Sequence, residues 1–435
     1  MNEAELLELD QNLNWHPCSQ MKEYENFKPL VIKRAYDSYL ELSDGRKIID
    51  AISSWWCKSL GHNHPELKKA AFAQIEKFEH VLFARTTYDV VVELAQALSA
   101  LLPGLNKVSY ASDGSSAVEI ALKMSMHARY LQNQPQRTQF IALKNGYHGE
   151  TIGALGVSDL GLYKTPYNPW LFSSVFIEPL YVQNKQDPRW NDATEHWIAI
   201  EKQLAAYTDT ATAIILEPIV QGAAGMKIYS QDFLKRLSLW AKTHDVHLIA
   251  DEIMTGIGRT GNMLACEYAG IQPDFLCLSK GLTSGWVPFS VVLSTDPIYQ
   301  LFYGEDEGNR TFAHSHTYSG NALGASLALA TLKIVKRDQL CLRAQALEPI
   351  LEAHMNEIAE KTGALQNVRA IGAIVAADLI QGDGKNRKLV QKAGELGALL
   401  RPIGNTLYWL PPLNIGLDTL EDLKDISLEA LKGTL

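Results

Sequence analysis

The chain has 435 residues, of which 46% are hydrophobic and 20% charged, enough to bury one large core and a smaller one. Its net charge of -9 comes from 40 basic and 49 acidic residues without a basic run, which argues against a nucleic-acid or anionic-membrane partner. Five cysteines without a C-x-x-C pair, an acidic start without a signal-like stretch and the lack of a long apolar run predict a cytoplasmic protein without a membrane partner.

Alternating helix-like and strand-like patterns dominate the chain. A polar, aromatic-rich segment runs to about Trp56, and an amphipathic helix is expected over residues 65–78. Strand-like runs follow at residues 107–111, 140–143, 213–216, 246–250, 275–278 and 289–293. The alternation predicts an α/β fold in which a mostly parallel or mixed sheet is covered on both faces.

The pattern changes near the C-terminus. Beyond about Ile334 it becomes a long charged helix followed by short strands near residues 368–377 and 406–410. The polar stretch at residues 187–195 is interpreted as a surface loop rather than a boundary. We therefore expect a large domain and a smaller α+β domain, with these bounds: N-terminal segment of the small domain 1–60, large domain 61–334, C-terminal small domain 335–435.

A candidate phosphate site lies where the run at residues 107–111 leads into a helix-like pattern. A helix N-terminus offers free N–H groups, Gly114 lets an anion approach the backbone, and Ser115 adds a hydroxyl. Ser116 with Glu119 fits a capping box. A capped helix without any ligand is the commoner explanation of such a pattern when it stands alone.

A turn with glycines on both sides of an aromatic pair comes after the next run. Gly146 and Gly149 flank Tyr147 and His148. Such a turn can present a ring at a strand end, where a flat cofactor needs a stacking partner. A buried turn tyrosine is the alternative.

A carboxylate and a lysine each come directly after an apolar run: Asp251 follows residues 246–250, and Lys280 follows residues 274–279. Parallel strands deliver their functional groups at their carboxyl ends, so the two side chains should share one edge of the sheet. A carboxylate beside a pyridine nitrogen and a lysine that forms a Schiff base with an aldehyde are the two groups that pyridoxal phosphate requires.

Residues 256–261 match G-x-G-x-x-G, but residues 251–255 separate them from the preceding run, and Pro273 interrupts the segment on their C-terminal side. A dinucleotide site, and with it a dehydrogenase, is therefore disfavoured. We interpret the segment as a glycine loop that positions Arg259 near an active site.

Two further functional classes are disfavoured. The pairs His62/His64 and His314/His316 have H-x-H spacing but no further ligand cluster nearby, so no metal site is expected. A cofactor-fold regulator would need a basic DNA-reading segment, which the sequence lacks.

Four segments, in this order along the chain, resemble the signature of class III pyridoxal-phosphate aminotransferases: residues 215–222, 249–261, 278–281 and 316–321. The resemblance implies the PLP-dependent transferase fold (fold type I), with a mostly parallel central sheet, and pyridoxal 5'-phosphate as cofactor. Further segments narrow it to the branch that acts in biotin biosynthesis: residues 15–17, 53–56, 61–65, 145–149, 401–404, 408 and 411–412.

The resemblance also implies roles for single residues. Lys280 would form the Schiff base and Asp251 would pair with the ring nitrogen of the cofactor. Gly114 and Ser115 would hold the phosphate, and Tyr147 would cover the ring.

Other implied roles concern the substrate and a second subunit. His316 and Thr317 would reach the phosphate of the neighbouring subunit, which implies a homodimer with shared active sites. Arg401 would bind the carboxylate of the keto acid through two parallel hydrogen bonds. The substrate pocket would further contain Trp55, Tyr147, Arg259, Lys280, Ser315 and Tyr408.

The chain departs from the family pattern at two places. Cys18 stands where the family usually has a tyrosine after Trp-His-Pro, and Ser315-His316 precede Thr317 where the family has Gly-Pro. The first change removes a hydroxyl that helps to recognise the substrate. The second replaces a rigid turn but keeps the hydroxyl of Thr317.

The implied activity is a two-stage transamination of 7-keto-8-aminopelargonate to 7,8-diaminononanoate, with S-adenosyl-L-methionine as the expected amino donor. Lysine as donor, or transamination of an ω-amino acid, are the alternatives. The sequence does not choose the donor, because adenosylmethionine and lysine present the same α-amino acid head group.

Overall fold

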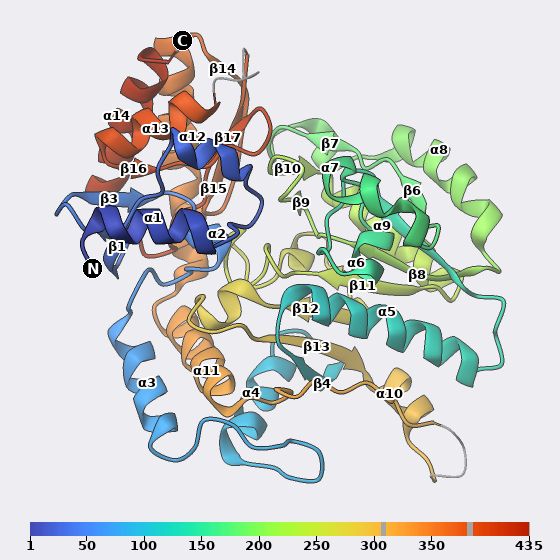
Figure 1. The fold of residues 1–435 in the computed structure, drawn as a ribbon. Helices are drawn as coiled ribbons and strands as arrows, with labels where there is room; N and C mark the ends of the chain where they lie inside the picture. Colours follow the sequence, from blue (N-terminus) through green and yellow to red (C-terminus); the bar gives the residue numbers. More distant parts are fainter. Residues whose placement is uncertain (306–309, 381–385, 435) are drawn as a thin grey trace.

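A seven-stranded sheet forms the centre of the larger part of the molecule in the computed structural model, which describes residues 1–305, 310–380 and 386–434 (Figure 1). Its strands in spatial order are β4 (Leu105–Ala111), β13 (Ser290–Thr295), β12 (Phe275–Leu278), β11 (His247–Asp251), β8 (Ala211–Leu216), β5 (Gln139–Leu143) and β6 (Val175–Ile177). β13 is antiparallel to both of its neighbours, and the other pairs are parallel. The sheet confirms the predicted α/β fold, and the sequence runs predicted each strand except β6.

Both faces of this sheet are covered because its central strands are apolar on both sides. Every residue of β8, β11 and β12 is buried. Neighbours along β8 alternate between two cores, with Ile214 in one and Ile215 in the other. The helices on the two sides of the sheet are α3 (Pro65–Ile75), α4 (Asp89–Ser99), α5 (Gly114–Leu131), α6 (Ile152–Gly156), α8 (Thr194–Leu204), α9 (Gln231–Thr243), α10 (Asp296–Phe302) and α11 (Ala322–Arg337).

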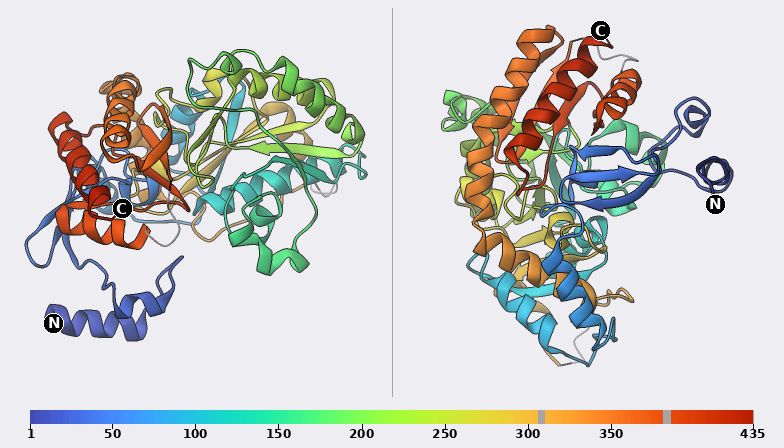
Figure 2. Two further views of the ribbon diagram at one scale, coloured as in Figure 1. Left: turned by 90° about the horizontal axis from the view of Figure 1, so that it is seen from above. Right: turned by 90° about the vertical axis from the view of Figure 1, so that its left-hand side faces the viewer.

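A smaller α+β unit lies beside the central sheet and contains segments from both ends of the chain (Figures 1 and 2). Its three-stranded sheet contains β14 (Leu365–Ile371), β15 (Ile374–Leu379) and β17 (Thr406–Trp409), with α12 (Leu340–Thr362), α13 (Asn386–Leu396) and α14 (Leu417–Lys432) around it. In a second sheet, β1 (Ile32–Tyr36), β2 (Tyr39–Leu42) and β3 (Lys47–Asp50) are followed by β16 (Ala398–Leu399). We propose the bounds 1–60, 61–334 and 335–435 on this basis.

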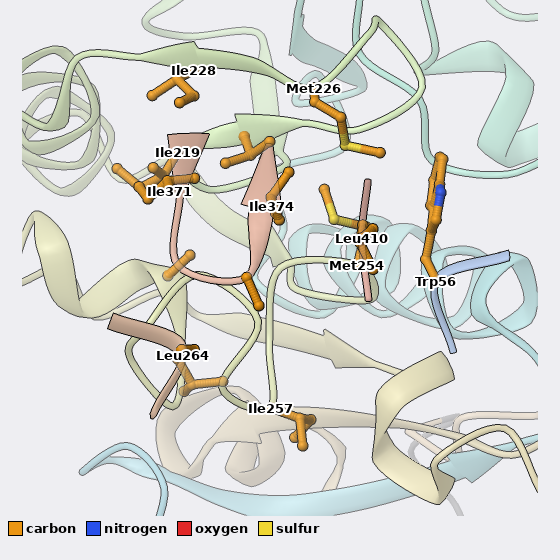
Figure 3. Packing of buried hydrophobic residues seen from close by; sticks show 14 of the residues in the cluster. Trp56, Ile219, Met226, Ile228, Met254, Ile257, Leu264, Ile371, Ile374 and Leu410 are labelled. Carbon is orange, nitrogen blue, oxygen red and sulfur yellow. The ribbon is translucent and has the colours of Figure 1, made fainter. Parts of the chain in front are cut away.

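One hydrophobic core connects the N-terminal, central and C-terminal parts of the chain. Figure 3 shows Trp56, Met254 and Leu410 within it, each from a different part. Ile371 and Ile374, on the turn between β14 and β15, also belong to it. The smaller unit therefore packs directly against the loops that leave the central sheet.

Two local predictions need correction. The N-cap of α5 is Asp113, whose Oδ1 accepts the Ser116 N–H at 2.9 Å, so the predicted capping box of Ser116 and Glu119 is wrong. Glu119 instead accepts the Gly153 N–H of α6. The loop predicted at residues 187–195 contains a 3-10 turn, Pro188–Trp190, and gives way to α8 at residue 194.

The ends of the molecule show two further features. Helix α1 (Glu3–Leu13) projects from the body in both views of Figure 2, and none of its side chains is buried. Of the helices within the described ranges, none has the length and apolar character needed to cross a membrane.

Candidate active site

A cavity lies at the edge of the central sheet where the carboxyl ends of β4, β5, β8, β11 and β12 come together. The strands β11 and β12 are parallel neighbours, so Asp251 and Lys280 share this edge as predicted. The lining residues come mainly from the loops after these strands: Trp56, Asp113, Gly114, Ser115, Tyr147, His148, Gly149, Glu217, Asp251, Ile253, Met254 and Lys280. Strand polarity therefore explains why residues so distant in sequence meet here.

Asp251 is held by a buried histidine. Its Oδ2 lies 2.8 Å from Nδ1 of His148, and its Oδ1 accepts the Ile253 N–H at 3.2 Å. Both side chains of the pair are almost fully buried. Nε2 of His148 has no hydrogen-bond partner among the described residues. The carboxylate thus has a fixed orientation on one side of the cavity.

Glu217 is a second buried carboxylate in the lining. Its Oε1 accepts the Tyr147 N–H at 3.0 Å, and its Oε2 accepts the Gly222 N–H at 2.9 Å. Burial raises its pKa to about 7, with the negative charge of Asp251 adding to the rise. Glu217 therefore connects the turn that carries Tyr147 with Gly222, which follows the short strand β9 (Val220–Gln221).

Lys280 begins a 3-10 turn directly after β12 and has a positive φ of 45°. Its Nζ lies 4.5 Å from the centre of the Trp56 ring. Burial lowers the pKa of this amine, while the negative charges of Asp251 and Glu217 oppose the change. A lysine with a lowered pKa is more often neutral, which a nucleophilic amine requires.

The N-terminus of α5 also lines the cavity, through Asp113, Gly114 and Ser115. The first amide groups of a helix have no acceptor within it, and they favour an anion together with the helix dipole. Two loops approach closely here: a Cβ atom on Gly149 would lie 2.1 Å from Oγ of Ser115, and one on Gly114 would lie 3.0 Å from Ile253. Gly149 is therefore required by space and by its φ of 123°, whereas a side chain at position 114 would require Ile253 to shift slightly.

This set of groups fits pyridoxal phosphate. A lysine amine, a buried carboxylate and a helix N-terminus surround one cavity. They match the aldehyde, the ring nitrogen and the phosphate of the cofactor respectively. Tyr147, which lines the same cavity, is in place to lie against a ring.

Arg401 and Trp55 form a separate stacked pair. The guanidinium carbon of Arg401 lies 4.2 Å from the centre of the Trp55 ring. Trp55 is 40% exposed. Tyr163 is near both this pair and the cavity lining: its ring centre is 5.6 Å from that of Tyr147, and the charge of Arg401 opposes the rise in its pKa that burial causes. The predicted substrate residues Trp55 and Arg401 are thus together, although neither lines the cavity itself.

The other predicted substrate residues are more distant from the lining. Tyr408 is buried, and its hydroxyl accepts the Trp56 Nε1–H at 3.0 Å, which places it one residue behind the cavity wall. Arg259 is buried and donates to the carbonyl oxygens of Ala373 and Pro411, so it connects the two units of the chain. Contact of Arg259 with the substrate stays a prediction.

The segment with Ser315, His316 and Thr317 does not contribute to the cavity lining of the described chain. Ser315 and Thr317 are exposed, and the backbone carbonyl oxygen of Thr317 lies 2.9 Å from Nε2 of His80. Their predicted contact with the phosphate of a second subunit stays a prediction.

Sequence reasoning missed several lining residues. Glu217 comes directly after the run at residues 213–216, so the rule that selected Asp251 would have selected it too. His148 was noticed only as part of an aromatic turn. Trp56 and Met254 lie in two segments that carry the family resemblance, residues 53–56 and 249–261, but the sequence indicated no role for either side chain.

Comparison with known proteins places these features in context. A family model for class-III aminotransferases matches residues 19–431. The chain is 39% identical over 427 residues to the adenosylmethionine-8-amino-7-oxononanoate aminotransferase of Helicobacter pylori, covering 96% of this chain and 95% of that protein.

Two solved structures are similar over nearly their full length. The adenosylmethionine-8-amino-7-oxononanoate aminotransferase of Methanocaldococcus jannaschii has a TM-score of 0.93 at 33% identity, covering 100% of both chains. An amine transaminase from an uncultivated Pseudomonas species, solved in its PLP-bound form, has a TM-score of 0.90 at 31% identity, covering 97% of this chain and 98% of that one. These similarities confirm the predicted fold.

Proposed function

This chain belongs to the class-III aminotransferases, and we propose that it converts 7-keto-8-aminopelargonate to 7,8-diaminononanoate in biotin biosynthesis, with pyridoxal 5'-phosphate as cofactor. The observation that carries the proposal is the joint placement of Lys280 and Asp251 at the ends of neighbouring parallel strands, around one cavity. The choice of substrate is supported by relatives named for it over nearly their whole length.

In this proposal Lys280 and Asp251 would hold the cofactor at its aldehyde and its ring nitrogen. Gly114 and Ser115 would hold its phosphate through the N-terminus of α5, and Tyr147 would cover its ring. Asp251, oriented by His148, would keep a proton on the ring nitrogen. The bound cofactor supplies an electron sink that allows a proton to leave the α-carbon of the amino donor.

The protein's own groups then move that proton and bind the substrates. The Lys280 amine would take the proton from the donor α-carbon as a general base and deliver it to the cofactor as a general acid. Its lowered pKa makes the neutral amine, which acts as the base, more available. Arg401 binds the carboxylate of the keto acid in a fork of two hydrogen bonds, and Trp55 keeps the guanidinium in place.

The proposal extends to the donor, the assembly and the compartment. S-adenosyl-L-methionine is the proposed donor because the relatives' names contain adenosylmethionine. We propose a homodimer with shared sites, in which Thr317 of one subunit reaches the phosphate site of the other, and a cytoplasmic location. Cys18, which lies beside Tyr163, takes the place of the usual tyrosine.

A donor panel tests the function. The purified protein is incubated with pyridoxal phosphate, 7-keto-8-aminopelargonate and either S-adenosyl-L-methionine, lysine or an ω-amino acid, and 7,8-diaminononanoate is measured by mass spectrometry. We expect the diamine with adenosylmethionine and little with the other donors. Product only with lysine would overturn the donor assignment. Turnover of ω-amino acids without amination of the keto acid would overturn the function.

A further inference from the structure

Four consecutive residues in the described chain adopt a conformation that side chains of L-amino acids disfavour. Ser53, Ser54, Trp55 and Trp56 have φ values of 49°, 44°, 70° and 74°, and none is a glycine. They form a left-handed turn, α2 (Ser53–Trp56). Such strain persists only where the surrounding structure enforces it, and it concentrates at functional sites.

This turn carries two aromatic side chains toward the proposed active site. Trp55 stacks on the guanidinium of Arg401, and Trp56 lies under the amine of Lys280. A right-handed turn would direct both rings elsewhere, because the side-chain direction depends on the backbone conformation. The strained backbone is therefore the feature that brings one ring to each of two functional side chains.

A buried hydrogen-bonded pair, Asp50 and His62, adjoins the turn. Oδ2 of Asp50 accepts hydrogen bonds from Oγ of Ser54 and Nε2 of His62, both at 2.8 Å. Oδ1 of Asp50 accepts the Ile52 N–H at 3.3 Å. Burial opposes ionisation of Asp50, but the hydrogen bonds from His62 and Ser54 outweigh it and lower its pKa.

His62 is itself fixed in place. Its residue is 7% exposed, and its backbone exchanges two hydrogen bonds with Asp37, at 2.7 and 3.0 Å. Hydrogen bonds therefore link the backbone bridge at His62, through the side chains of His62 and Asp50, to Ser54, the residue before Trp55. No group in this connection lines the cavity.

We propose that Asp50 and His62 are a positioning pair that holds the left-handed turn and thereby keeps Trp55 over Arg401 for binding of the acceptor carboxylate. The inference rests on the proposed function for the identity of the acceptor. The geometric part of the inference, that the pair keeps Trp55 over Arg401, does not depend on the proposed function.

The test is a double-mutant cycle of His62→Gln and Trp55→Ala, with His64→Gln as the control. His64 belongs to the same H-x-H motif, but its side chain takes no part in the hydrogen bonds around Asp50. If His62 acts through Trp55, His62→Gln raises the KM for the keto acid by about fivefold with a smaller change in kcat, and by less than about twofold when Trp55 is already alanine. His64→Gln leaves both constants unchanged.

A second readout does not depend on the substrate. The rate at which phenylglyoxal modifies Arg401, measured by peptide mass spectrometry, should rise in His62→Gln and in Trp55→Ala, and should rise no further in the double variant. Equal effects of His62→Gln in both backgrounds, or none on either readout, would overturn the inference. If His62→Gln does not fold, Ser54→Ala removes the adjoining hydrogen bond to Asp50 and takes its place in the cycle.

The two readouts separate this inference from the proposed function. A wild-type protein that fails to aminate the keto acid contradicts the function alone, and the modification rates at Arg401 still decide the geometric part. Amination by the wild type with additive effects in the cycle contradicts the positioning role alone.

Discussion

At the scale of single residues, the candidate site depends on ionisable side chains that are buried close to one another. Asp251 and Glu217 are both buried, and each accepts hydrogen bonds that fix its orientation. Lys280 lies close enough to both for their charges to act on its amine. The chemistry that we propose therefore depends on the placement of three groups rather than on any one of them.

Glu217 should make the stability of the protein fall as the pH rises. Its pKa in the folded chain is about 7, whereas an unfolded glutamate titrates near 4.5. Below pH 4.5 both states hold the proton. Between these two values only the folded state does, so stability decreases as the pH rises through this window and stays lower above it, by on the order of 3 kcal/mol.

Urea denaturation of the cofactor-free protein at several pH values measures this effect. Relative to wild type, Glu217→Gln should gain stability between pH 4.5 and 8, on top of a constant loss from its weaker hydrogen bonds. Glu201→Gln, at an exposed position of α8, is the control and should behave like the wild type. Parallel curves for wild type and Glu217→Gln would contradict the assignment.

Arg401 should matter mainly for the acceptor. Loss of a hydrogen bond to a charged group costs about 1.5 to 3 kcal/mol, so Arg401→Ala should raise the acceptor KM by about tenfold or more. Arg401→Lys keeps the charge without the fork and should have an intermediate effect. Single-turnover measurements of each half-reaction separate the substrates. A weakened donor half with an unchanged acceptor half would reassign Arg401 to the donor.

At the scale of elements, the sequence predicted the features that depend on periodicity and strand polarity. The runs before Asp251 and Lys280 became β11 and β12, and their parallel pairing placed both side chains at one edge. The left-handed turn at α2 was not predictable, since neither Ser nor Trp favours positive φ. Side-chain hydrogen bonds of Asp50, and one from Oγ of Ser53 to the distant Leu410 carbonyl oxygen, hold that turn, and a single sequence does not show them.

The N-terminus of α5 was likewise predicted only in part. The start of the helix next to Gly114 was predicted from the strand-to-helix pattern. The capping residue was not predicted, because Asp113 and Ser116 are both residue types that favour the N-cap position. The hydrogen bond that the Ser116 N–H donates to Oδ1 of Asp113 shows that Asp113 is the cap. Glu119, free of that role, holds the start of α6.

The segment before α11 carries the prediction about assembly. If Thr317 completes the site of a partner subunit, a heterodimer of a Lys280→Ala chain and a Thr317→Ala chain contains one complete site. Subunit exchange between these two weakened variants should then restore activity. The control mixes Thr317→Ala with a chain that carries both substitutions, which offers no complete site. Mixtures no more active than this control would contradict shared sites.

At the scale of the whole molecule, the two units are tied by buried arginines that each donate across the junction. Arg259 reaches the carbonyl oxygens of Ala373 and Pro411, and Arg369 reaches those of Gly225 and Met226. The sequence indicated a change of pattern near Ile334 but not these contacts, because an arginine that serves backbone carbonyl groups has no motif.

Arg369 should therefore be important for stability. Its residue is 7% exposed, and besides the carbonyl groups it pairs with Asp378 at 2.8 Å. Arg369→Met leaves these acceptors without a donor and should lower the free energy of unfolding by about 3 kcal/mol, measured by urea denaturation. Arg46→Met breaks a half-exposed pair with Asp44 and should cost less than about 1 kcal/mol. Equal costs would contradict this role of the junction.

The whole account depends on Lys280 as the residue that binds the cofactor. Borohydride reduction of the protein loaded with pyridoxal phosphate, then digestion and mass spectrometry, identifies the labelled lysine directly. We predict a single labelled peptide that contains Lys280, with the label lost in Lys280→Ala and retained in Lys58→Ala, whose amine instead donates to the carbonyl oxygen of Gly285. Label on another lysine, or no label after loading, would contradict the account.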